Sequence, residues 1–124
     1  MNPSYKRLTL QIEGIFEGQL EAVKEAANEQ WPFQLWNHYG NNVFASGEGF
    51  LNPHENKEEF ADRLSVAIWD ANQGYCAIEI QETYVEFYPH SICQRDKSDY
   101  ERLGNLRFPI KNQLRKIMSS SQFH

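Results

Sequence analysis

Apolar positions recur along the chain with two different spacings, and each spacing predicts a type of secondary structure. Apolar and polar residues alternate from residue 5 to residue 13, which predicts a half-buried strand over residues 5–13. Apolar residues at helical spacing predict helices over residues 17–30 and 57–73. Asn56 and Glu59 form a capping-box signature at the start of the second helix. The chain is therefore predicted to mix strands with helices.

A hairpin is predicted around residues 40–42, because Gly and Asn tolerate the backbone of a tight turn. Its two strands cover residues 33–39 and 43–51, and short strands joined in this way pair with each other. Gly47 and Gly49 interrupt the second strand. They indicate either a bulge or the close approach of another backbone.

A final strand region is predicted over residues 76–88, but its alternation changes phase partway along. Ile78 and Ile80 occupy even positions, whereas Val85 and Phe87 occupy odd positions. A shift of one residue moves every later side chain to the other face of a sheet. We therefore predict a bulge or a tight turn at residues 81–83.

The order of these elements resembles the ferredoxin-like βαββαβ layout, an α+β fold in which two helices cover one face of an antiparallel sheet. The resemblance covers residues 5–88, and we expect the whole chain, residues 1–124, to be a single domain. Residues 89–124 are predicted to form a basic C-terminal extension. Ser98 and Glu101 predict a short helical turn there, and a helix of about ten residues is predicted from Pro109.

Charge is distributed unevenly between the core and this extension. Residues 1–94 carry 14 acidic and 5 basic side chains, a net charge of −9, and residues 95–124 carry 3 acidic and 7 basic ones, a net charge of +4. An acidic core repels nucleic acid, so we do not expect DNA or RNA as a partner. The chain has neither an apolar run long enough to span a membrane nor a signal-peptide pattern. We therefore expect a cytoplasmic protein that does not bind a membrane.

Two groups of charged side chains are candidate partner-binding residues. On the first helix, acidic residues at successive i, i+4 positions form a ridge, which suits either a basic partner or an ordinary solvated face: Glu17, Glu21, Glu25 and Glu29. On the C-terminal helix, basic residues flank a narrow apolar stripe: Lys111, Arg115 and Lys116. We expect that stripe to pack on the open face of the sheet or on a second subunit. Contact with nucleic acid or an anionic membrane is the alternative.

Trp36 and His38 are the candidate pocket residues, because alternation places both on the same face of the second strand. His38 would then act as a general base near neutral pH. The alternative is that Trp36 packs under a helix or at an interface while His38 lies at the solvent edge.

Metal, cofactor and thiol chemistry is not predicted. His90 with Cys93, and His54 with the nearby glutamates, supply too few ligands for zinc. Cys76 and Cys93 belong to no CxxC motif, so we expect both to be buried free thiols.

These observations favour a non-enzymatic binding or regulatory module that acts through a protein partner or its own homodimer. The alternative is a small enzyme or ligand binder of the dimeric α+β barrel kind, with its pocket near Trp36 and His38. No catalytic motif in the sequence selects a reaction.

Overall fold

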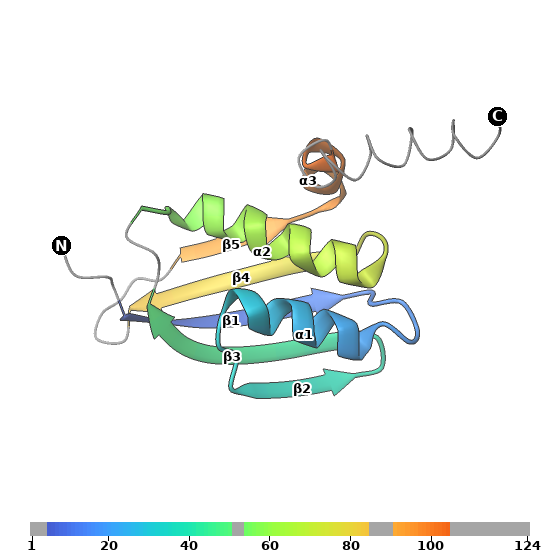
Figure 1. Cartoon of the computed structure of the whole chain (residues 1–124), viewed down its shortest axis with the longest axis horizontal. Coiled ribbons are helices and arrows are strands. Elements are labelled where there is room, and N and C mark those ends of the chain that lie inside the picture. The colour runs from blue at the N-terminus through green and yellow to red at the C-terminus, as the bar shows by residue number, and fades with distance from the viewer. Residues whose placement is uncertain (1–4, 51–53, 85–90, 105–124) are drawn as a thin grey trace, which may run out of the picture.

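The computed structural model describes residues 5–50, 54–84 and 91–104, which form an α+β structure with a five-stranded antiparallel sheet and three helices (Figure 1). The elements follow one another along the chain as β1 (Tyr5–Glu13), α1 (Leu20–Gln30), β2 (Leu35–Tyr39), β3 (Asn42–Phe50), α2 (Lys57–Asn72), β4 (Ala77–Tyr84), β5 (Ser91–Arg95) and α3 (Lys97–Arg102).

The strands lie in the order β2-β3-β1-β4-β5, and each neighbouring pair is antiparallel. Helices α1 and α2 lie side by side on one face of the sheet (Figure 1). The sequence pattern predicts four strands. The fifth, β5, lies in the region predicted as an extension outside the sheet, and it pairs with β4.

The core lies between the sheet and the two helices. Leu8, Leu10 and Ile12 of β1 point toward the helices and are almost fully buried, while the residues between them face the other side. Val23 and Ala27 of α1 and a larger set of α2 residues complete the core. The alternation in β1 therefore identified the buried face of the sheet correctly.

Helix α2 begins with the predicted capping box. The Asn56 side chain accepts from the Glu59 backbone N–H at 2.8 Å, and the Glu59 carboxylate accepts from the Asn56 N–H at 3.2 Å. The predicted cap of the short later helix was wrong. Helix α3 is capped by Asp96 and Asp99 rather than by Ser98 and Glu101. The Asp96 carboxylate accepts from the Asp99 backbone N–H, and the Asp99 carboxylate accepts from the Asp96 N–H.

The predicted interruption at residues 81–83 was also wrong. Strand β4 pairs with β1 without a break from Ala77 to Tyr84. The buried face carries Ile78 and Ile80 and then Glu82, which is 6% exposed and bonded to the Lys6 ammonium at 2.5 Å. Val85 and Phe87, the odd-numbered apolar residues on which the predicted change of phase depends, lie outside the described residues. Within the described strand, Glu82 keeps the even-numbered, core-facing phase because its charge is paired with Lys6.

The predicted hairpin joins β2 to β3 through Gly40 and Asn41, and Gly40 has a positive φ of 60°. Gly47 lies against another backbone, as one of the two predicted alternatives required. A Cβ at Gly47 would stand 2.1 Å from the Pro32 carbonyl oxygen. The segment that leads into β2 therefore packs directly on β3.

Helix α1 starts at Leu20 rather than at residue 17, so Glu17 lies in the preceding turn. The helix predicted from Pro109, with Lys111, Arg115 and Lys116, lies outside the described residues, as does His90. Among the described helices, none has the length and apolar character needed to cross a membrane.

Candidate functional site

The face of the sheet opposite α1 and α2 is mainly polar and ends in two edge strands, β2 and β5. One row of paired residues crosses it from edge to edge: Leu35, Ser46, Thr9, Gln81 and Ile92. The centre of this row is polar, whereas Leu35 and Ile92 at its ends are 52% and 54% exposed. Within this row, the apolar side chains that meet solvent are therefore those of the two edge strands.

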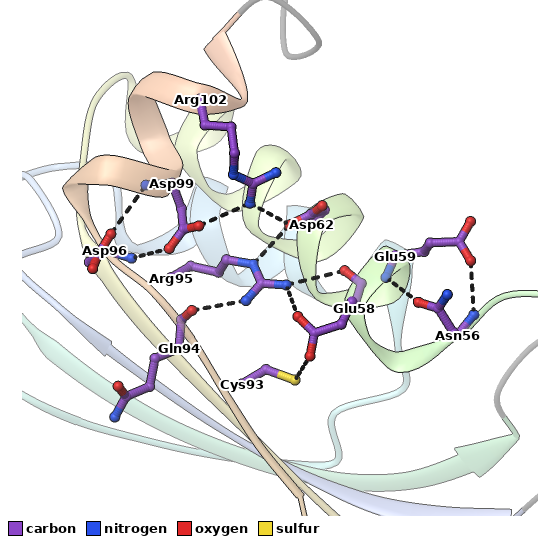
Figure 2. Close-up of polar contacts among 10 residues, drawn as sticks. All are labelled: Asn56, Glu58, Glu59, Asp62, Cys93, Gln94, Arg95, Asp96, Asp99 and Arg102. Atoms are coloured by element: carbon purple, nitrogen blue, oxygen red, sulfur yellow. Dashed lines mark hydrogen bonds and ion pairs between the residues drawn. The ribbon is translucent and has the colours of Figure 1, made fainter.

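The β5 edge is fixed to α2 by Arg95, whose side chain is 7% exposed (Figure 2). Its guanidinium donates to Glu58 Oε1 at 2.8 Å and to Asp62 Oδ1 at 2.8 Å. It also donates to the Glu58 and Gln94 carbonyl oxygens. Burial alone would lower the pKa of Arg95, but the bonds to Glu58 and Asp62 outweigh burial and raise the pKa. The buried cation is thus neutralised by two carboxylates of α2.

Cys93 belongs to the same cluster through Glu58. Its Sγ donates to Glu58 Oε2 at 3.3 Å. The hydrogen bond from Arg95, followed by that from Cys93, holds the pKa of Glu58 below its usual value. Burial and the bond to Glu58 raise the pKa of the Cys93 thiol to about 11. Such a thiol is protonated at neutral pH and is a poor nucleophile.

Helix α3 closes this end of the molecule. Arg102 contacts Asp99 at 2.9 Å and Asp62 at 3.3 Å (Figure 2). Tyr100 stacks edge-on against Trp69 of α2 and against Tyr75, with ring centroids 5.2 and 5.7 Å apart. The β5–α3 segment is therefore held by charges on one side and by aromatic rings on the other.

The β2 edge has no comparable cluster among the described residues. Leu35 and Tyr39 lie on the open face, and Tyr39 is 72% exposed. The five residues from Leu35 to Tyr39 include no Lys, Arg, Asp, Glu or Pro. Those are the residues with which natural edge strands resist pairing with other chains. Strand β2 thus presents an outer edge without these protective features.

On its other face, β2 borders a trough of about 340 Å³ that separates it from α1. The trough is lined by Leu20, Glu21, Lys24, Trp36, Asn37, His38 and Val43. The Lys24 ammonium lies 5.7 Å from the centre of the Trp36 ring. The indole N–H of Trp36 is buried and has no hydrogen-bond partner among the described residues. The trough therefore combines an aromatic wall with the ion pair of Lys24 and Glu21, 3.8 Å apart, beside a strand edge that is unpaired among the described residues.

Some of the candidate residues predicted from the sequence lie together at the trough, and others do not. Trp36 and His38 line the trough, and Glu21 of the acidic ridge lines it as well. Glu25 and Glu29 are exposed on α1 and do not line the trough. Cys76 and Cys93 are free and buried, as predicted, and burial raises the pKa of Cys76 to about 12.

Sequence reasoning missed the Arg95 cluster altogether. In β5, Cys93 and Arg95 are buried on one face while Ile92 and Gln94 are exposed on the other, a pattern that predicts a strand only if an arginine is accepted at a buried position. The carboxylates that make this possible lie more than 30 residues earlier, on α2.

Comparison of the chain with protein-family models, with curated proteins and with solved structures finds no match.

Proposed function

We propose that this chain is a non-enzymatic binding module that accepts an extended segment of a partner along the outer edge of β2. The observation that carries the proposal is that edge itself: a five-residue strand with exposed Leu35 and Tyr39 and without a charged residue or proline. A strand added there would gain main-chain hydrogen bonds along β2. Its alternate side chains would contact Leu35 and Tyr39 on one face and the trough on the other.

Two features near the edge support selective binding rather than indiscriminate pairing. The trough supplies an aromatic surface at Trp36 together with the opposite charges of Lys24 and Glu21. The start of β2 is held rigidly, because Trp31 donates from its indole N–H to the Gly47 carbonyl at 3.0 Å. A rigid edge loses little conformational freedom on binding.

The test is selection from a displayed library of random peptides, with the purified full chain as bait. We expect selected peptides that bind along β2, detected as backbone amide shifts of β2 by NMR. Leu35→Asp should weaken their binding at least about tenfold, because it removes an apolar contact and places a charge on the edge. Ile92→Asp is the matched control, since Ile92 has a similar exposure and lies in the same row at the opposite edge. Equal losses for both variants, or shifts confined to another surface, would refute the proposal.

A second candidate function is a small enzyme or ligand binder of the dimeric α+β barrel kind, favoured by the trough that Trp36 and His38 share. There the ligand would stack on Trp36, and His38 would exchange a proton with it. A fragment library screened by ligand-detected NMR tests this. The binding of any hit should be reduced by His38→Ala and unaffected by His54→Ala, and a hit indifferent to His38→Ala would exclude this site.

We also propose that the fold is the ferredoxin-like layout extended by β5 at the β4 edge, and that the protein works in the cytoplasm with a protein partner rather than with nucleic acid. The support is the order of elements from β1 to β4 and the acidic balance of residues 1–94.

A further inference from the structure

We infer that the segment that pairs with β2 is β2 of a second copy of this chain, joined antiparallel about Asn37. Two five-stranded sheets would then form one continuous sheet with helices on the same face of both halves. This inference rests on the proposed function, because it names the partner that the β2 edge accepts.

The register follows from the geometry of β2. A two-fold axis perpendicular to a sheet pairs residues of equal parity, since paired side chains must point to the same face. Asn37 is the middle residue of the strand, so a centre at Asn37 pairs all five residues from Leu35 to Tyr39. A centre at Trp36 or at His38 would pair only three of them.

This register is self-complementary on the open face. Leu35 of one copy lies opposite Tyr39 of the second copy, and the reverse pair forms on the other side of the axis. Both side chains are more than half exposed in one copy. Cross-strand pairs of an aromatic with an aliphatic side chain stabilise antiparallel sheets. The pairing therefore covers two of the exposed large apolar side chains of each copy.

The helix-facing side is complementary as well. Trp36 of one copy lies opposite His38 of the second copy, so the two troughs meet at the boundary between the two copies. The charged residues that line each trough are one anion, Glu21, and one cation, Lys24. The boundary between the two copies therefore carries no excess of like charge, although each whole chain has a net charge of −5. Salt screens the repulsion between the chains, so association should strengthen as salt is raised.

Strand β5 is less suited to pairing with itself. Its middle residue is Cys93, so a self-pairing would place the apolar Ile92 opposite the polar Gln94. Its last residue, Arg95, is already bonded to α2. Pairing about the middle residue of the strand thus favours self-association through β2 and disfavours self-association through β5.

The first experiment uses Asn37, which would face its own copy across the axis. Asn37→Lys and Asn37→Glu each place like charges directly opposite one another, which destabilises a strand pair. We expect the unmodified chain to sediment as a dimer, each variant alone as a monomer, and an equimolar mixture of the two as a heterodimer. Ile92→Lys, at the other edge, should leave the dimer intact. A monomeric unmodified chain, or a mixture of the two variants that stays monomeric, would overturn the inference.

Crosslinking fixes the register. In Asn37→Cys the two new thiols would lie opposite one another, and mild oxidation should link the copies. In His38→Cys the new thiols would be offset by two residues, farther apart than the roughly 7 Å between Cα atoms that a disulfide tolerates. The native thiols should not interfere, because both are buried and their pKa values are raised. Equal crosslinking of the two variants, or crosslinking of His38→Cys alone, would show that the register is wrong.

The outcomes separate this inference from the proposed function. If selected peptides bind along β2 while the chain itself is monomeric, the proposed function stands and the inference fails. If the heterodimer and the Asn37→Cys crosslink both form, the partner at the β2 edge is a second copy. Weaker self-association as salt rises from about 50 to about 200 mM would contradict the inference, because it would mean that oppositely charged surfaces hold the two copies together.

Discussion

β2 and β5 are five-residue antiparallel strands at opposite ends of one sheet, yet different interactions hold them in place. Strand β5 is held by its side chains, because the Arg95 guanidinium bridges two carboxylates of α2. Strand β2 is held by its backbone, through the hairpin to β3 and the close contact at Gly47. Since the exposed side chains of β2 are not needed to anchor it, they are available to a partner.

The strongest test of this comparison removes the β5 anchor. In Arg95→Met, Glu58 and Asp62 lose their shared cation, and we expect the free energy of unfolding to fall by about 2 to 4 kcal/mol. Urea denaturation measures the loss. Arg7→Met is the control, since Arg7 is largely exposed and 3.5 Å from Glu48, so its change should stay below about 1 kcal/mol. Similar losses for the two variants would mean that Arg95 does not anchor β5.

The next test acts on the β2 anchor. In Gly47→Ala the new Cβ would overlap the Pro32 carbonyl oxygen, and backbone must move to accommodate it. We expect a loss of about 1 to 3 kcal/mol in the free energy of unfolding and weaker binding at the β2 edge. Gly104→Ala is the control, because a Cβ there would have no atom within 4 Å. An unchanged stability of Gly47→Ala would contradict the proposed anchor.

A smaller effect is expected at the junction of β5 and α3. Asp96→Ala removes the side chain that accepts from the Asp99 N–H, and should cost about 1 kcal/mol of stability by thermal or urea unfolding. Ser98→Ala should change stability by less than half as much, because Ser98 is not the cap. A larger loss of stability for Ser98→Ala than for Asp96→Ala would instead support Ser98, the residue predicted from the sequence, as the cap.

The smallest expected effect depends on pH. Because the pKa of Glu58 in the folded chain is lowered by Arg95, its contribution to stability is present above the ordinary value of 4.5 and is lost as pH falls through the folded-state pKa. Glu58→Gln should therefore narrow the difference in unfolding midpoint between about pH 7 and about pH 3. Glu25→Gln, on the exposed side of α1, should leave that difference unchanged. A steeper loss of stability in acid for Glu58→Gln would contradict the stated direction of the pKa shift.

Local patterns account for what could be predicted. The alternation in β1, the helical spacing and capping box of α2, and the turn residues of the β2–β3 hairpin all depend on neighbours within a few positions. The same alternation placed Trp36 and His38 on one face of β2. Their inclusion in a trough with Lys24 could not be predicted, because it requires the position of α1 above the sheet.

Two of the differences between prediction and structure, in β4 and β5, involve charged side chains at buried positions. Glu82 occupies a core-facing position of β4 inside the segment where a bulge was predicted, and Arg95 concealed a strand. Each is tolerated only because an opposite charge lies nearby in space but distant in sequence, Lys6 for Glu82 and Glu58 with Asp62 for Arg95. Unpaired charges cannot be buried at such sites without a large desolvation cost.

The sequence by itself determined the succession of strands and helices from β1 to β4, the buried face of β1 and the burial of both cysteines, because side-chain periodicity and local turn chemistry are sufficient for these. Only the tertiary structure decided which strands lie at the edges and which charges are paired. The order β2-β3-β1-β4-β5 brings together residues that are far apart in the chain. Within the described part of the chain, it leaves the outer edge of β2 unpaired and β5 bound to α2.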